Sequence, residues 1–197
     1  ASSMPSSYEG LYIRGELWRA FTSLVSHADF GHLASNLLLF IPLAYMIAGH
    51  FPGMLPVSFL AGAAVNLAVV RTLPPQAELI GISGVVYFLG AAWLTLYYLI
   101  ARGEKRSRRF GAALFLTLML FVPETLKPQV SHLSHFLGYV SGVGAALTYF
   151  LFNRRAFRAA EEYVLVQEPA PKDTADTFIP EEEWKSRQLP PASGNHS

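Results

Sequence analysis

Residues 83–100 read Ser-Gly-Val-Val-Tyr-Phe-Leu-Gly-Ala-Ala-Trp-Leu-Thr-Leu-Tyr-Tyr-Leu-Ile and hold no charged side chain. A helix that crosses a bilayer needs about 20 mostly apolar residues, with a range of roughly 17–25, so this run is long enough to span one. Its first residue, Ser83, lies between Gly81 and Gly84. A serine at the mouth of a membrane span is a candidate nucleophile. The rest of the chain should then supply a base, oxyanion donors and a route for water.

Four further apolar runs predict an all-α polytopic membrane protein with five transmembrane helices. The 197 residues are 52% hydrophobic and only 15% charged, whereas soluble domains carry about 25% charged residues. A soluble bundle is disfavoured because five helices that are apolar all round would leave it no water-facing side. The fourth span is short, and we expect Pro123 to end it. The four further runs are Phe30–Ala48, Met54–Val70, Phe110–Val122 and Ser131–Phe152.

Lysine and arginine predict the orientation of these spans. Cytoplasmic loops carry an excess of both residues, and the bases cluster after the third span and after the fifth, which alternation places on one side. That side is predicted to be cytoplasmic, so residues 1–29 and the loops 73–82 and 123–130 lie outside. Residues 153–197 form the cytoplasmic tail, which is expected to be largely disordered. The bases are Arg102, Lys105, Arg106, Arg108, Arg109, Arg154, Arg155 and Arg158.

Composition narrows the possible chemistry further. The net charge is +1 and no basic surface with interleaved aromatic residues is visible, so no nucleic-acid partner is expected. Cysteine is absent, which excludes disulfides, thiolate catalysis and cysteine-based metal sites.

Polar side chains are costly in hydrocarbon, so each ionisable one inside a span is a functional candidate. Two of them, four residues apart at the start of the first span, share one helical face. Two histidines open the fifth span, and a tyrosine follows Ser83 by one turn. These residues are His32, Asn36, Tyr87, His132 and His135.

The candidate base is a histidine. Serine is a weak nucleophile until a base takes its proton, and histidine titrates near physiological pH. His135 and Ser83 both start spans that run from outside to inside, so they can lie at the same depth. His132 is a rival; we prefer His135 because Gly138 and Gly142, on its face, let a neighbouring helix approach closely. The facing surface would be that of Gly84 and Gly90 on the third span.

A tetrahedral intermediate also needs hydrogen-bond donors aimed at its negative charge. The Ser83 N–H and the side chains of His32 and Asn36 are the candidates, because the first span also starts on the outer side.

Each feature has a plainer interpretation that the residues alone leave open. Ser83 could cap its helix, and His32 or Asn36 could make an ordinary interhelical hydrogen bond. Asn66 and Arg71 are interpreted as packing or interface residues. A metal site would need three or four ligands on one centre; its candidates are His27, His32, His132 and His135.

The motifs together resemble the rhomboid family of intramembrane serine proteases across residues 14–152. The matching segments occur in the family's order and spacing. They are Gly15-Glu16-Leu17-Trp18-Arg19, then His27, His32 and Asn36 as H-x4-H-x3-N, then Gly81-Ile82-Ser83-Gly84 with Tyr87, and finally His135, Gly138 and Gly142 as H-x-x-G-x-x-x-G.

This resemblance implies a Ser-His dyad that cleaves transmembrane proteins within the lipid bilayer and needs no cofactor. Ser83 would be the nucleophile and His135 the general base, with His32, Asn36 and the Ser83 amide as the oxyanion hole. Tyr87 would pack on the His135 ring. His27 would support the outer loop and line the water-filled cavity, and Glu16, Trp18 and Arg19 would belong to a structural loop.

The resemblance also sets the expected organisation of the chain. Residues 1–29 form an extracytoplasmic segment, 30–152 the membrane domain and 153–197 the tail. The family core has six spans, and residues 1–13 are too short and polar to be the first, so that span is expected to be missing. The short fourth span and the loop 123–130 are expected to gate substrate entry. The alternatives are an inactive rhomboid-like scaffold for transmembrane clients and a small transporter.

Overall fold

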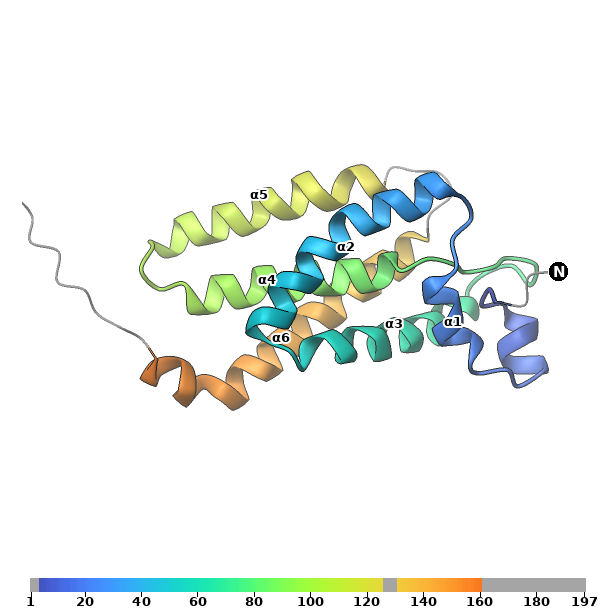
Figure 1. Ribbon diagram of the computed structural model, residues 1–197, viewed down its shortest axis with the longest axis horizontal. Helices are drawn as coiled ribbons and strands as arrows, with labels where there is room; N and C mark the ends of the chain where they lie inside the picture. Colours follow the sequence, from blue (N-terminus) through green and yellow to red (C-terminus); the bar gives the residue numbers. More distant parts are fainter. Residues whose placement is uncertain (1–3, 126–130, 161–197) are drawn as a thin grey trace, which may run out of the picture. The chain divides into compact units, whose positions relative to one another are not determined.

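In the computed structural model, which describes residues 4–125 and 131–160, the apolar run from Ser83 forms the central helix α4 (Ser83–Ile100). Every residue from Val85 to Ala92 is buried. Helix α4 packs against four other helices (Figure 1). They are α2 (Phe30–His50), α3 (Met54–Val70), α5 (Arg106–Thr125) and α6 (His132–Ala159). The described chain is helical, as expected, apart from its loops and one isolated β-bridge.

Two polar caps explain where the helices that carry candidate site residues begin. The Asp29 carboxylate accepts a hydrogen bond from the His32 N–H at 2.8 Å and starts α2. The Ser131 hydroxyl accepts one from the Ser134 N–H at 3.3 Å and starts α6. Such side-chain caps satisfy N–H groups that have no acceptor within the helix. Both caps therefore fix where α2 and α6 begin, and so on which side of its helix each following histidine lies.

Small residues let α4 and α6 touch through their backbones. A Cβ on Gly138 would overlap the carbonyl oxygen of Gly84, and one on Gly142 would overlap that of Phe88. This is the close approach expected of the paired glycines on α6. Gly90 differs from the expectation, because its surface is filled by the ring of Phe121 from α5.

The membrane assignment agrees with the helices. By length and composition α2, α4 and α6 can each cross a bilayer, and α3 is an apolar helix of 17 residues. Large apolar side chains cover the outside of the bundle: Phe30 and Tyr45 are each 82% exposed and Phe152 is 86% exposed. Exposed apolar surface of this extent is typical of a lipid-facing or partner-facing side.

Several predicted boundaries were too narrow. Helix α2 continues to His50 and α6 to Ala159, and α5 starts at Arg106 and continues through Pro123 to Thr125. Hydropathy reports the apolar part of a helix, whereas backbone hydrogen bonds continue into its basic ends. The expectation that Pro123 ends the fourth span was wrong, because membrane helices tolerate proline where neighbours satisfy the freed backbone groups. Residues 126–130 of the predicted gate loop 123–130, and the part of the predicted tail beyond residue 160, lie outside the described residues.

The segment before α2 is folded against the bundle. It contains a single π-helical turn, η1 (Glu9–Ile13), and α1 (Arg19–Val25). Ser6 and Leu79 exchange backbone hydrogen bonds of 3.0 and 2.8 Å, which join this segment to the loop before α4.

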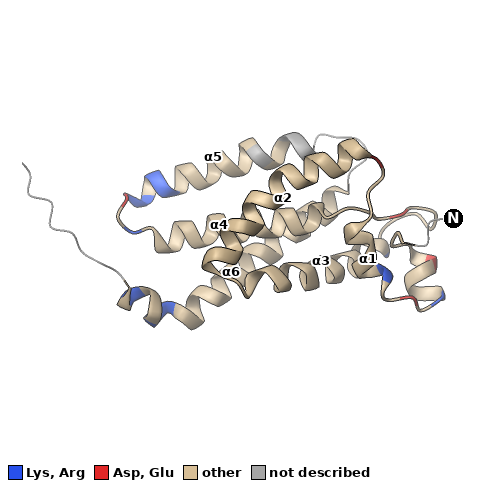
Figure 2. Cartoon of the chain, in the orientation of Figure 1, with Lys and Arg blue, Asp and Glu red and all other residues tan. Residues whose placement is uncertain are grey.

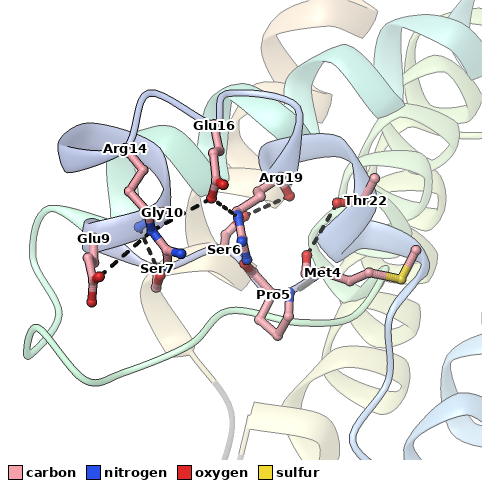
Figure 3. Close-up of polar contacts among 10 residues, drawn as sticks. All are labelled: Met4, Pro5, Ser6, Ser7, Glu9, Gly10, Arg14, Glu16, Arg19 and Thr22. Atoms are coloured by element: carbon pink, nitrogen blue, oxygen red, sulfur yellow. Dashed lines mark hydrogen bonds and ion pairs between the residues drawn. The ribbon is translucent and has the colours of Figure 1, made fainter. Parts of the chain in front are cut away.

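Arg19 lies at the centre of that segment (Figure 3). Its guanidinium pairs with Glu16 at 2.5 Å, and the residue is only 7% exposed. The same carboxylate lies 3.8 Å from Arg14, and the guanidinium of Arg19 lies 5.1 Å from the ring centre of Trp18. The Gly-Glu-Leu-Trp-Arg motif thus places one buried, paired base at the start of α1.

Candidate active site

The candidate site is a cavity of about 550 Å³ at the end of the bundle where α2, α4 and α6 begin. The four residues predicted as the dyad and the oxyanion donors line it together: Ser83, His135, His32 and Asn36. They come from three different helices. The wall is completed by Gly81, Gly84, Asn66, Glu78, Ala28, Asp29, Gly31, Ser35, Leu79, Ile80, Ser131 and Ser134.

Ser83 is the first residue of α4, and it does not cap that helix. The capping position is Ile82, and no side chain makes the cap hydrogen bond. The interpretation of Ser83 as an N-cap is therefore wrong. The first N–H groups of a helix have no acceptor within it, and this end of the helix carries a partial positive charge. A negatively charged oxygen beside Ser83 would meet both.

Gly81 brings the oxyanion candidates against the chain that leads into Ser83. Its φ of +106° lies in the region that favours glycine. A Cβ built there would lie 2.9 Å from Nε2 of His32 and 3.6 Å from Nδ2 of Asn36. The N–H of Gly81 donates to the carbonyl of Ser23 at 2.9 Å. The turn is therefore fixed from one side by α1 and faces the two α2 side chains on the other.

His135 is buried, with 3% of its surface exposed, in the first turn of α6. Its ring stacks on Tyr87, with ring centres 4.2 Å apart and planes at 15°. The Tyr87 hydroxyl donates to the carbonyl of Phe121 at 2.8 Å, which ties the stacking ring to α5. This is the arrangement expected of Tyr87, and it restricts how the imidazole can turn.

The rival histidine faces elsewhere. His132 is exposed and is not among the residues that line the cavity. It lines a second, apolar hollow of about 210 Å³ with Phe136 and Tyr139, and His135 borders this hollow as well as the cavity. Of the two histidines that open α6, only His135 shares the cavity with Ser83.

His27 lies beside the cavity without lining it, contrary to expectation. Its ring meets that of His32 edge-on, with centres 5.2 Å apart and planes at 71°. The pKa of His27 is lowered from its usual range, first by burial and then by the neighbouring His32. His27 therefore packs against the ring of His32 and helps to hold that ring in place.

Asn66 and Glu78 are among the lining residues that were not predicted to belong to the site. Asn66 of α3 donates to the Ala20 carbonyl at 3.2 Å and to the Ser23 hydroxyl at 3.0 Å. Its polarity inside an apolar span was the available signal, although it was interpreted as packing. Glu78 is an exposed loop residue, and nothing in its neighbourhood of the sequence marks it. In the described part of the chain, no three histidine or acidic side chains are close enough to hold a metal ion.

Comparison with known proteins identifies the family of the chain. The model of the Rhomboid domain matches residues 14–153, which is more than half of the chain and includes every helix from α1 to α5 and most of α6. A search of curated proteins found no match. This chain, an integral membrane bundle of helices, therefore belongs to the rhomboid family.

Proposed function

We propose that this rhomboid-family protein is an intramembrane serine endopeptidase with Ser83 as nucleophile and His135 as general base. The observation that carries the proposal is that Ser83 and His135, from two helices in backbone contact, line one cavity with His32 and Asn36. Serine, histidine and convergent donors in one hollow are the groups that acyl transfer requires.

The proposed reaction has two stages. His135 takes the proton of the Ser83 hydroxyl as its oxygen attacks the scissile carbonyl carbon, and the resulting oxyanion accepts hydrogen bonds from the Ser83 N–H, His32 and Asn36. The protonated His135 then gives its proton to the leaving amine as the C–N bond breaks, which leaves an acyl ester on Ser83. Water entering the cavity, with His135 again as base, hydrolyses that ester.

The stacking of His135 on Tyr87 supports this role because a general base must be held in a defined orientation. An aromatic pair of this kind contributes about 0.5–1.5 kcal/mol beyond its buried area. The hydroxyl bond from Tyr87 to α5 holds the stacking ring in turn. The stack on Tyr87 therefore limits the orientations open to the imidazole.

The substrates we propose are transmembrane segments of other proteins. The cavity opens at one end of the bundle, at the depth where α4 and α6 start. The helical backbone of a substrate is fully hydrogen-bonded within lipid, so its scissile carbonyl becomes accessible only when the helix unwinds. Sequences with helix-destabilising residues near that depth should therefore be preferred.

The cavity is proposed to open outside the cytoplasm. Figure 2 shows lysine and arginine gathered where α5 begins and α6 ends. That end is opposite Ser83 and His135, each of which lies at the start of its helix. The excess of bases marks the cytoplasmic side.

The test uses purified protein reconstituted in vesicles with a labelled transmembrane substrate. We expect Ser83→Ala and His135→Ala to abolish cleavage. Ser141→Ala, on α6 away from the cavity, and His50→Ala, at the other end of the bundle, should leave it unchanged. A fluorophosphonate probe should label the wild type and not Ser83→Ala. Cleavage that survives Ser83→Ala would reject the assignment, and a folded wild type that neither cleaves nor labels would favour the scaffold.

A further inference from the structure

The end of the bundle away from the cavity carries a concentration of positive charge that the proposed protease chemistry does not use. Residues 101–110 contain five bases and one acid, Glu104, which pairs with Arg108 at 3.7 Å. The last turns of α6 add exposed bases to the same end (Figure 2). They are Arg154, Arg155 and Arg158, for which no ion pair is found within the described residues.

Two of these guanidinium groups are held on one tyrosine. Arg106 Nε donates to the Tyr98 hydroxyl at 2.7 Å, and Arg109 Nη1 donates to the Tyr98 carbonyl at 2.6 Å. Their guanidinium carbons lie 6.0 and 5.6 Å from the centre of the Tyr98 ring. Both guanidinium groups are therefore held in place by Tyr98, which reduces the entropy cost of ordering them when an anion binds.

Most donors of this pair remain available. Each guanidinium has five N–H groups, and one from each is used on Tyr98. Arg109 Nε has no hydrogen-bond partner among the described residues, but it is buried, so a ligand from outside would be met by the other N–H groups of the pair. The pair also lies in the first turn of α5, a helix of 20 residues, whose N-terminus favours negative charge. Planar guanidinium groups match phosphate oxygens better than lysine does.

The depth of the pair corresponds to lipid headgroups. Helix α6 has 28 residues, so it is about 42 Å long against a hydrocarbon core of about 30 Å. Its basic end therefore projects beyond the core. Aromatic rings gather near that end: Phe51 lies 6.3 Å from Trp93 and 5.6 Å from Tyr149, and Phe157 lies 6.3 Å from Phe51. Such rings are enriched at the membrane–water boundary.

A stripe of exposed apolar side chains leads from the arginine pair along α5. Phe110, Leu114 and Leu118 follow at intervals of one turn and are 58%, 47% and 52% exposed. Residues four apart lie on one helical face. A phosphate on the pair would thus continue into acyl chains lying on this stripe, which a free phosphate ion could not use.

We propose that Arg106 and Arg109, held on Tyr98, form a binding site for the phosphate headgroup of an anionic phospholipid, with the acyl chains along Phe110 and Leu114. The site is independent of Ser83 and His135, so it stands whether or not the protein is a protease.

The test measures lipid binding by native mass spectrometry of the full chain in neutral detergent, titrated with phosphatidylglycerol or with phosphatidylcholine of the same acyl chains. We expect phosphatidylglycerol to bind the wild type about 10- to 30-fold more tightly, as two bases at a membrane surface allow. Arg106→Gln with Arg109→Gln should reduce that ratio to about 2-fold. Arg14→Gln with Arg71→Gln, an equal loss of charge at the other end, should not change it.

Three outcomes would overturn the proposal: equal affinity of the wild type for both lipids, an unchanged ratio in the double variant, or an equal loss in the control. Displacement of phosphatidylglycerol by millimolar inorganic phosphate would reassign the site to a soluble anion. If the double variant does not fold, Arg106→Gln alone carries the test, because this side chain is exposed. It should lower the ratio at least 3-fold, and an unchanged ratio would reject the site.

Discussion

The contact between α4 and α6 makes the strongest prediction, the effect of Gly138→Ala. The added methyl would overlap the Gly84 carbonyl oxygen and lie 3.2 Å from the Gly84 Cα and carbonyl carbon. Carbon atoms pack best at about 3.5–4.0 Å, so the two helices must separate by roughly 1 Å. Backbone atoms cannot turn away as a flexible side chain would.

That separation acts directly on the proposed dyad. Ser83 is bonded to Gly84, and His135 lies one turn before Gly138, so a shift at this contact moves nucleophile and base apart. A misplacement of about 1 Å can reduce a catalysed rate about 100-fold, and overpacking costs about 1–3 kcal/mol of stability. We expect a loss of cleavage near 100-fold with a moderate fall in Tm.

Gly144→Ala is the matched control. A Cβ at Gly144 meets no atom within 4 Å, and alanine is favoured over glycine within a helix by about 0.5–1 kcal/mol. Cleavage should stay within about 2-fold of the wild type, with an equal or higher Tm. The assay is the initial rate on a reconstituted transmembrane substrate, together with thermal unfolding in detergent. Wild-type rate and Tm in Gly138→Ala would refute the reasoning, since the helices would then not need this contact.

Three further predictions concern the surroundings of the dyad. Gly81→Ala places a Cβ 2.8 Å from the His32 ring at a φ that disfavours it, so cleavage should be lost and stability should fall by about 1–3 kcal/mol; normal activity in this variant would contradict the assigned geometry. Tyr87→Phe keeps an aromatic ring to stack but loses the bond to the Phe121 carbonyl, so thermal unfolding should show a loss of about 1 kcal/mol with most cleavage retained. The pKa of His27 is lowered in the fold, so its stabilising contribution is full above its ordinary pKa of about 6.5 and is lost as pH falls through the lower folded value. The Tm of the wild type should therefore fall more than that of His27→Gln between pH 7.5 and 5. Parallel curves of Tm against pH for the two proteins would reject this.

The helical membrane bundle could be predicted from periodicity and hydropathy, because each helix is one continuous segment and both properties are read from such segments. The spans Met54–Val70 and Ser83–Ile100 were predicted with the bounds that the structure has. The fourth span was not, because the basic turn Arg106–Arg109 is helical while carrying no apolar signal. Pro123 was expected to end this span, but α5 continues to Thr125. Membrane helices tolerate proline where neighbouring groups satisfy the freed backbone hydrogen bonds.

The candidate site was predictable only as a set of residue types and spacings. The two histidines of α6 are three residues apart, and the sequence could prefer His135 but could not show that His132 stays out of the cavity that Ser83 lines. It gave no means to include Glu78 or to place Asn66 at the cavity wall. Loop residues have no periodicity from which a direction could be inferred.

The sequence by itself determined that this chain is a membrane bundle of the rhomboid family, since span length, basic loops and motif spacing are all properties of the linear chain. Only the tertiary structure decided which polar groups share one cavity. The approach of α4 to α6 through Gly84 and Gly138 sets the separation of Ser83 from His135. That approach results from the packing of backbones far apart in the chain, which local preferences do not encode.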